Sequence, residues 1–506
     1  MGALLESEFE IRQTIESLRT QNKKITLCHG VFDLLHPGHL EHLSQAARMG
    51  DILIVSITAD QFVNKGPGRP AFNLKTRMLA MSRIVGIDFV IPSNNTTAIQ
   101  NIELVRPDYY VKGSEYKDAV NDVTGMIDKE RDVVQLYGGK LFFTEGFTSS
   151  STRLINEFMS SQDPETKEWL SEFRKRFSIQ QIVEYLEQCS NIRVGIVGEV
   201  IIDKYTNCLP LSKSSKDPIL AFHRQDSVEI PGGVLAIANN CAMWSKEVHV
   251  FSNAALILND QQNIHEQIDK KIKYFCSKNK SRPLIIKHRY IDSSSKIRLF
   301  ETYDFNPDSM AGLEEIDFVD ILQDKIGDLD LVVVADYGHG LMTKASIDLI
   351  SESARFLCVN TQSNAGNRGY NTIAKYANAN LICLNGSELQ LELRDKNPNY
   401  FEIVPQYISR MNADYAILTL GGEGMLVFNN AGEYTKVPAL ASRVVDKVGA
   451  GDSVLAIGSL LAYLRAPVEI IGLLCSLVAA HEIGQLGHRT SLSASNLLKS
   501  VKGVLG

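Results

Sequence analysis

Residues 24–42 read KITLCHGVFDLLHPGHLEH, and this stretch decides the fold of the first part of the chain. A β-branched run leads into a glycine turn and then into helical spacing, which is the usual opening of an α/β unit. His36 and His39 stand three residues apart at the expected start of the helix. Backbone N–H groups and the helix dipole favour anions there, so both imidazoles can bind phosphate oxygens and stabilise charge that develops during in-line attack. On this pattern alone, two other interpretations of the histidines stay open, namely a loop without a chemical role and a metal-binding pair.

Short apolar segments repeat after this opening and alternate with helical spacing. They lie at residues 51–57, 88–92, 108–112 and 140–144. This alternation predicts a parallel sheet wrapped by helices over about 140 residues.

A second opening of the same kind, IRVGIVGEVIID, lies at residues 192–203. Later strand-like segments lie at residues 330–337, 355–361, 380–385 and 415–422. We therefore predict a second α/β domain, large and doubly wound, at residues 191–506. The first domain is predicted at residues 1–160, and the charged, helical segment 161–190 is predicted to be a linker helix.

Composition excludes several classes of protein. The chain has 506 residues, of which 44% are hydrophobic and 22% charged, so it can form full-sized cores. A net charge of -7 argues against a nucleic-acid partner, because phosphate backbones select basic surfaces. The eight cysteines are scattered without a CxxC pair, which is typical of buried thiols in a reducing compartment. With no signal peptide or membrane-spanning segment in the pattern, we expect a cytoplasmic protein.

The stretch VDKVGAGDS at residues 445–453 precedes a long apolar segment. Gly449, Ala450 and Gly451 let backbone N–H groups approach an anion at the start of a helix. Asp452 can then accept a proton from an attacking hydroxyl. An ordinary helix N-terminus is the alternative interpretation.

Four motifs in the first domain occur in the order found in the HxGH nucleotidyltransferase superfamily, which includes the cytidylyltransferases. They are CHGVFDLLHPGHLEHL (28–43), KGPGRP (65–70) with Arg77 behind it, PDYYVKGSEY (107–116) and FTSSSTRLI (147–155). Residues 22–160 therefore resemble this superfamily almost throughout, which implies a Rossmann-like fold.

This resemblance implies that His36 and His39 stabilise the transition state at the α-phosphate of a nucleoside triphosphate. The residues that it implies for nucleotide binding are Gly30, Phe32, Asp33, Lys65, Arg69, Lys112, Gly113, Ser150, Ser151 and Thr152. Mg²⁺ would bridge the phosphates. We expect His42 to be a solvated helix residue, and the role of His29 stays open.

The second domain resembles the ribokinase/PfkB carbohydrate kinases over about residues 191–500. The motifs that carry this resemblance are IPGG (230–233), NGSE (385–388), TLGGEG (419–424) and GAGD (449–452). The resemblance makes Asp452 the catalytic base and makes Asp203, Gly232 and Gly233 sugar-binding residues. ATP would bind through Asn385, Glu388, Thr419, Gly421, Gly422, Gly424, Gly449, Ala450 and Gly451, and Glu388 would hold Mg²⁺ through water.

Both domains resemble the halves of the bifunctional heptose-phosphate kinase and heptose-1-phosphate nucleotidyltransferase family, with the order of the halves reversed. That family implies a homodimer built by a small β-lid around residues 205–230 and 285–305. Several positions depart from the kinase pattern, namely Glu199 for aspartate, Ala236 for asparagine, His339 for lysine, Asn360-Thr361-Gln362 for Asp-Pro-Lys and Lys447-Val448 before GAGD. These departures favour a changed substrate or a weakened kinase over a changed fold.

The predicted function is therefore a sugar kinase coupled to a sugar-1-phosphate nucleotidyltransferase. The kinase would use ATP, the transferase ATP or CTP, and the product would be a nucleotide-activated sugar, such as ADP- or CDP-heptose, for lipopolysaccharide or capsule. The alternative keeps only the transferase active and makes the second domain a binding or oligomerisation module. An aminoacyl-tRNA synthetase-like activity is disfavoured by the acidic charge and the lack of a KMSKS-like loop.

Overall fold

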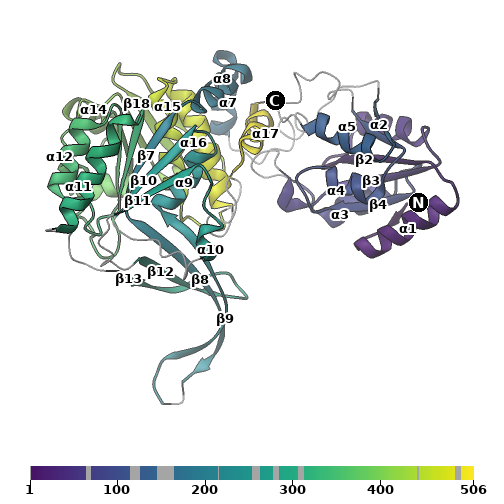
Figure 1. The fold of residues 1–506 in the computed structure, drawn as a ribbon, viewed down its shortest axis with the longest axis horizontal. Coiled ribbons are helices and arrows are strands. Elements are labelled where there is room, and N and C mark those ends of the chain that lie inside the picture. Colours follow the sequence, from purple (N-terminus) through teal and green to yellow (C-terminus); the bar gives the residue numbers. More distant parts are fainter. Residues whose placement is uncertain are drawn as a thin grey trace. The chain divides into compact units, whose positions relative to one another are not determined.

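Two compact units make up the computed structural model of the chain. Unit 1 comprises Met1–Gln162 with Ser495–Gly506, and unit 2 comprises Asp163–Ala494 (Figure 1). The structure describes residues 2–63, 70–113, 126–144, 164–214, 216–252, 262–276, 284–305, 313–441, 444–484 and 492–505.

A six-stranded parallel sheet forms the centre of unit 1, with the strand order β1-β4-β3-β2-β5-β6. Its strands are β1 (Ala3–Leu4), β2 (Ile25–Gly30), β3 (Ile52–Thr58), β4 (Phe89–Ser93), β5 (Tyr109–Lys112) and β6 (Lys140–Phe143). The order reverses between β2 and β5, and ligands of open parallel sheets bind at such a switch point, outside the carboxyl ends of the strands.

Helices cover both faces of this sheet. One apolar cluster includes Leu43 and Ala46 of α2 (Pro37–Ala47) and Met78 and Met81 of α3 (Leu74–Ser82). The other face is covered by α1 (Glu8–Thr20), α4 (Ile99–Val105) and α5 (Met126–Leu136). Unit 1 also contains α17 (Ala494–Leu505), apart from the first residue of that helix.

A nine-stranded sheet with the order β11-β10-β7-β14-β15-β16-β17-β18-β19 forms the centre of unit 2. It is parallel from β11 to β17, and β18 and β19 are antiparallel to their neighbours. The strands are β7 (Arg193–Gly198), β10 (Glu247–Ser252), β11 (Ile272–Cys276), β14 (Leu331–Asp336), β15 (Leu357–Thr361), β16 (Leu381–Asn385), β17 (Tyr415–Thr419), β18 (Met425–Asn429) and β19 (Tyr434–Val437).

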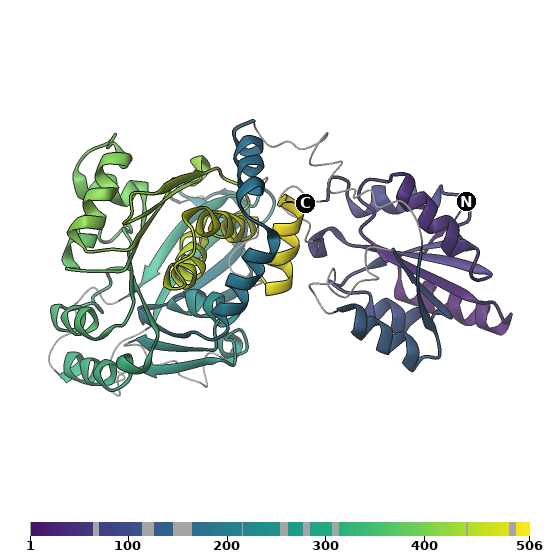
Figure 2. The same cartoon turned by 90° about the horizontal axis from the view of Figure 1, so that it is seen from above.

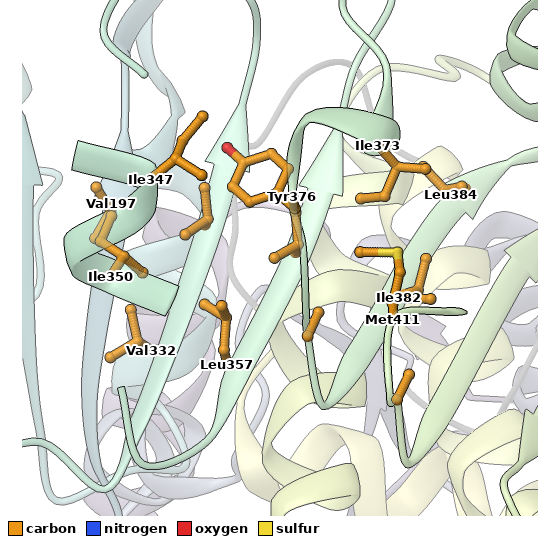
Figure 3. Packing of buried hydrophobic residues seen from close by; sticks show 14 of the residues in the cluster. Val197, Val332, Ile347, Ile350, Leu357, Ile373, Tyr376, Ile382, Leu384 and Met411 are labelled. Carbon is orange, nitrogen blue, oxygen red and sulfur yellow. The ribbon is translucent and has the colours of Figure 1, made fainter. Parts of the chain in front are cut away.

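Two layers of helices enclose this sheet (Figure 2). One layer holds α9 (Val234–Ala242), α15 (Ala450–Tyr463) and α16 (Val468–Ile483), and the other holds α11 (Leu313–Lys325), α12 (Lys344–Ser353), α13 (Gly386–Leu393) and α14 (Tyr400–Arg410). The short α10 (Gln262–His265) lies near β9. Val332 and Leu357 of the strands pack with Ile347 and Ile350 of α12 in the core of the second layer (Figure 3).

A separate four-stranded sheet, the lid, has the strand order β13-β12-β8-β9. Its strands are β8 (Val200–Lys213), β9 (Leu220–Gly233), β12 (Ile285–Asp292) and β13 (Arg298–Asp304). The long β8–β9 hairpin extends away from the helical layers of unit 2 (Figure 1). The lid begins next to β7, since only Glu199 separates β7 from β8.

Residues 164–189 form two helices, α7 (Pro164–Arg176) and α8 (Ile179–Cys189), that belong to unit 2. The Trp169 Nε1 group of α7 donates to Thr435 Oγ1 of β19 at 3.2 Å, and α8 packs on α15. The segment expected to be a linker thus contributes to the compact second unit. The predicted domain boundaries stay predictions. The division into compact units differs from them at the C-terminus, where α17 is grouped with unit 1 and not with the rest of residues 191–506.

The predicted fold class is confirmed. An N-terminal α/β domain with a parallel sheet is followed by a large, doubly wound α/β domain with a small β-lid. Among the residues that the structure describes, no helix combines the length and the apolar character needed to cross a membrane.

Removing the buried side chain of Ile182 tests whether α8 belongs to unit 2. Ile182 is fully buried, so Ile182→Ala should lower the free energy of unfolding of this unit by about 2–5 kcal/mol. Urea denaturation followed by tryptophan fluorescence measures it, because both tryptophans, Trp169 and Trp244, lie in unit 2. Glu187→Ala, at an exposed position of the same helix, is the control. Equal midpoints for the two variants would contradict this packing.

Candidate active sites

His36 and His39 lie together at the N-terminus of α2. His36 is the N-cap residue, and its Nδ1 accepts a hydrogen bond from Gly38 N at 3.1 Å. The two rings stack with centroids 3.9 Å apart, and the Phe32 ring meets His39 edge-on at 5.3 Å. Because the His36 Nδ1 accepts, the ring proton lies on Nε2, which becomes a donor. The pair can therefore present N–H groups to an anion at a helix N-terminus.

Three further predicted nucleotide-binding residues support this turn. Phe32 has a positive φ of 46°, and a Cβ on Gly30 would come within 3.0 Å of the Phe32 ring. The buried Asp33 carboxylate accepts from Ala71 N at 2.9 Å and Phe72 N at 3.0 Å. Asp33 thus fixes the chain that follows residues 64–69.

Lys112 lies at the end of β5 and is buried beside a carboxylate. Its Nζ is 2.9 Å from Glu130 Oε2, which also accepts from Tyr110 OH at 3.0 Å. Glu130 gives no signal in the sequence as a partner of Lys112. Gly113 follows directly, and Lys65, Arg69, Ser150, Ser151 and Thr152 lie outside the described residues.

Two more histidines near this site are held neutral. His29 Nδ1 contacts Ser56 Oγ at 3.0 Å, and burial, with the charge of Lys112, lowers the pKa of His29 to about 3. The expectation of a solvated His42 is wrong. Its Nδ1 contacts Thr144 Oγ1 at 3.0 Å, and burial lowers its pKa to about 4. Its place one turn beyond His39, on the side of β6, explains the difference.

In unit 2, the GAGD residues form the N-terminus of α15. Gly449 is its N-cap with φ 85°, a left-handed conformation that suits glycine. Ala450 and Gly451 follow in the first turn, with open space where a Cβ on Gly451 would lie. Asp452 Oδ1 accepts from Tyr337 OH and from Gln362 Nε2, both at 3.0 Å. Tyr337 is not among the residues predicted for this site, and Gln362 is predicted only as a departure from the kinase pattern.

The NGSE residues form a capping box at the start of α13. Asn385 Oδ1 accepts from Ser387 N at 2.9 Å, and Glu388 Oε2 accepts from Asn385 N at 2.8 Å. Glu388 Oε1 accepts from Ser363 N at 3.2 Å. Burial raises the pKa of Glu388 to about 7, although these hydrogen bonds oppose the rise. Asn385 Nδ2 also donates to Thr419 Oγ1 at 3.3 Å, which links two of the predicted nucleotide motifs.

The turn that follows Thr419 contains three glycines. Gly421 and Gly424 have φ values of 60° and 88°, and a Cβ on Gly424 would come within 2.0 Å of Val437 O. Gly422 has open space around it. The backbone of the turn therefore requires glycine at Gly421 and Gly424, and there is open space beside Gly422.

The predicted sugar-binding residues lie where the lid joins the sheet. Asp203 of β8 pairs with Arg289 of β12, and both side chains are buried. A Cβ on Gly232 would come within 2.5 Å of Asp203 Oδ2, and Gly233 has φ 54°. Arg289 gave no signal in the sequence, because only the pairing of β12 with β8 brings it to Asp203.

Asp446, three residues before Gly449, ties the lid to the GAGD turn. It pairs with Arg298 of β13, and it accepts from Tyr205 OH at 3.0 Å and Val448 N at 2.9 Å. Lys447 is exposed, and no ion pair joins it to Asp446 within the described residues.

Two protein families match the two parts of the chain that hold these candidate sites. The family described as cytidylyltransferase-like matches residues 27–157, and the pfkB family of carbohydrate kinases matches residues 302–494. The chain joins a cytidylyltransferase-like domain to a pfkB carbohydrate kinase domain. The resemblance to both families is thus confirmed, with the cytidylyltransferase-like domain first.

Curated relatives match the N-terminal part of the chain. "Bifunctional protein HldE" of Desulfatibacillum aliphaticivorans is 35% identical over 156 residues, which are 30% of this chain and 30% of that protein. The protein of the same name from Hydrogenovibrio crunogenus is 35% identical over 165 residues, 32% of each chain. The match thus spans about a third of these relatives. Among solved structures, phosphofructokinase-2 from Escherichia coli in complex with potassium is 14% identical with a TM-score of 0.49, covering 62% of this chain and 99% of that one.

The raised pKa of Glu388 in the pfkB domain predicts a pH-dependent stability. The unfolded chain loses this proton near the ordinary pKa of 4.5 and the folded chain near 7, so the wild type loses stability as the pH rises between these values. Glu388→Gln removes this loss. Between pH 5 and pH 8, its free energy of unfolding should rise relative to the wild type by up to about 3 kcal/mol.

Urea denaturation at a series of pH values, followed by tryptophan fluorescence, measures this difference. Glu423→Gln, at an exposed position, should leave the pH dependence unchanged. A Glu388→Gln curve parallel to the wild-type curve would contradict a raised pKa.

Proposed function

We propose that the protein is a two-step enzyme that activates a sugar. The pfkB domain phosphorylates the anomeric oxygen of a sugar or sugar phosphate with ATP. The cytidylyltransferase-like domain then couples the sugar 1-phosphate to a nucleoside triphosphate and releases pyrophosphate. The observation that supports this best is the presence of a complete set of reactive groups in each domain, the His36–His39 pair in one and the Asp452 carboxylate at a glycine-rich helix N-terminus in the other.

In the transferase step, the oxygen of the sugar 1-phosphate attacks the α-phosphorus of the nucleotide in line with the leaving pyrophosphate. His36 Nε2–H and the His39 ring would donate to the oxygens on which charge develops. Their place at the N-terminus of α2 adds the partial positive charge of the helix. Lys65, Arg69, Lys112, Ser150, Ser151 and Thr152 would bind the phosphates. Lys112 would do so while paired with Glu130.

In the kinase step, Asp452 would accept the proton of the sugar hydroxyl as its oxygen attacks the γ-phosphorus of ATP. The N–H groups at Gly449, Ala450 and Gly451 would stabilise the charge on the transferred group. The sugar would lie against Asp203, Gly232 and Gly233, and ATP against Asn385, Thr419, Gly421, Gly422 and Gly424.

Mg²⁺ would enter each site with the nucleotide and neutralise charge on its phosphates. This ion usually takes one or two carboxylates and completes its shell with water and phosphate oxygens. Glu388 fits such a role through water, because it is a single carboxylate beside the predicted ATP motifs and each of its oxygens already accepts a backbone N–H.

The heptose family makes a heptose the first candidate sugar, and ADP- or CDP-heptose for lipopolysaccharide or capsule the first candidate product. The departures at Ala236, His339 and Gln362 would lie on the sugar and phosphate sides of the site, so they also support a different sugar as the substrate. They also support the second candidate, a transferase with a non-catalytic pfkB domain. A cytoplasmic location is supported by the eight free cysteines, seven of which are buried.

A homodimer formed through the lid is part of the proposal. The lid exposes several large apolar side chains, and an apolar surface of this kind often marks a contact between proteins. They are Leu209, Leu211, Ile219, Leu220, Ile297 and Phe300. A second copy of the chain would cover them.

A mass-spectrometric screen tests the function. The purified protein is incubated with Mg²⁺, ATP or CTP, and a panel of sugars, sugar phosphates and sugar 1-phosphates. A nucleotide sugar formed from a sugar or sugar phosphate supports both steps. Formation only from a supplied sugar 1-phosphate would support the transferase alone.

Loss of His39 should affect the transferase step mainly in its transition state. His39→Ala should lower kcat for nucleotidyl transfer by about 10² to 10³-fold, with a much smaller change in KM. His223→Ala, an exposed histidine of the lid, is the control. Transfer at a near wild-type rate by the protein with both His36→Ala and His39→Ala would refute the assignment.

Loss of the Asp452 carboxylate should separate the two activities. Asp452→Asn should abolish sugar-dependent ATP consumption, because the amide cannot accept the hydroxyl proton, and it should leave transfer to a supplied sugar 1-phosphate intact. His39→Ala should show the opposite pattern. If Asp452→Asn consumes ATP as the wild type does, Asp452 is not the base.

A further inference from the structure

The Asp452 side chain is held by two neutral donors that come from different strand ends. Tyr337 follows β14, and Gln362 follows β15. The Tyr337 hydroxyl and the Gln362 amide both donate to the same oxygen, Asp452 Oδ1, at 3.0 Å. Two donors on one oxygen fix the rotation of the carboxylate about its Cβ–Cγ bond.

The buried Glu199 and two half-buried asparagines fix the backbone of Tyr337 on both sides. Its N–H donates to Glu199 Oε2 at 3.2 Å, and its carbonyl accepts from Asn364 Nδ2 at 2.7 Å and Asn367 Nδ2 at 2.9 Å. Burial raises the pKa of Tyr337 well above its usual value, so its hydroxyl keeps its proton and acts as a donor. Tyr337 is therefore a rigid donor.

Gln362 is held in the same way. Its N–H donates to Asp336 O at 2.8 Å, and its carbonyl accepts from Asn371 Nδ2 at 3.2 Å. Asn371 Nδ2 also lies 3.1 Å from Asp336 Oδ1. The three asparagines of the segment NAGNRGYN (364–371) thus fix the two strand ends that carry the donors.

We propose that Tyr337 and Gln362 are positioning residues that orient the Asp452 carboxylate for proton transfer in the kinase step. This inference rests on the proposed kinase activity, and it assigns a role to the departure at Gln362. A neutral amide orients the base without adding a positive charge beside it. Hydrogen-bond donors stabilise a carboxylate in its charged form, and a cation in the same place would do so much more strongly.

Other charges also act at Asp452 and must be kept constant in a test. Lys287 of β12 has its Nζ 5.8 Å from the centre of the Tyr337 ring and interacts with the Asp452 charge. Glu388 of α13 and Cys383 of β16 interact with the same charge. The variants below leave these three side chains in place.

A ¹³C NMR titration of the full-length protein, labelled with [4-¹³C]aspartate, follows the protonation of Asp452 directly. The signal lost in Asp452→Asn identifies the residue. Tyr337→Phe and Gln362→Met each remove one donor and should raise the titration midpoint by about half to one pH unit. Gln362→Lys should lower the midpoint by one unit or more, on the order expected for an adjacent opposite charge. Gln390→Met, which removes a partly buried glutamine that contacts Tyr400, is the matched control and should change nothing.

Kinetics add a second measurement once a phosphorylated sugar is known. Gln362→Met should lower kcat of the kinase step by roughly tenfold, the effect of one hydrogen bond to a charged group, with little change in KM. Unchanged midpoints in Gln362→Met and Gln362→Lys would overturn the proposal, even if Tyr337→Phe fails to fold. Shifted midpoints in a protein that phosphorylates no sugar would instead refute the kinase activity and leave the contacts established.

Discussion

The Glu199 carboxylate is the group on which the geometry of the candidate site in the pfkB domain depends. It is buried between β7 and β8 and accepts the backbone N–H groups of Tyr337, His339 and Leu341. These bonds hold the loop after β14, and that loop carries a donor to Asp452. Burial and the nearby Asp336 charge raise the pKa of Glu199 to about 7. The group that fixes the loop is thus a carboxylate whose charged form is disfavoured by burial and by the Asp336 charge.

Much of the fold could be predicted from the sequence, because its signals are local. The apolar segment at 51–57 overlaps β3, and the segment at 330–337 contains β14. The turns at Gly30 and Gly449 precede α2 and α15. The motif residues His36, Asn385 and Gly449 each cap a helix, a role set by their immediate neighbours.

The contacts between distant residues could not be predicted in this way. Tyr337 and Asp452 are 115 positions apart, and Arg289 and Asp203 are 86 apart. Their meeting depends on the order of strands in the sheet and on the register of β12 against β8. A single sequence does not encode that register in any short pattern, so the partners of each motif residue emerge only from the three-dimensional structure.

Burial shifts one titratable group toward its uncharged form in each of the two candidate sites. In unit 1, burial lowers the pKa of His29 to about 3, so this ring stays uncharged beside the charged Lys112. In unit 2, burial raises the pKa of Glu388 to about 7, so this group carries less charge at neutral pH than an exposed carboxylate, and a cation beside it would favour the charged form. In each unit, burial therefore favours the uncharged form of one titratable group near the candidate site.

The ion pair between Arg298 and Asp446 makes the lid and the turn before α15 mechanically dependent on each other. A movement of the lid away from the sheet would either break the ion pair of Arg298 with the buried Asp446 carboxylate or move the GAGD turn as well. Both changes would cost free energy. If a sugar binds under the lid and a phosphate at the GAGD turn, as proposed, the two binding events therefore share this ion pair. By thermodynamic linkage, a nucleotide that stabilises this turn would raise the affinity for the sugar, and the sugar would raise the affinity for the nucleotide by the same factor.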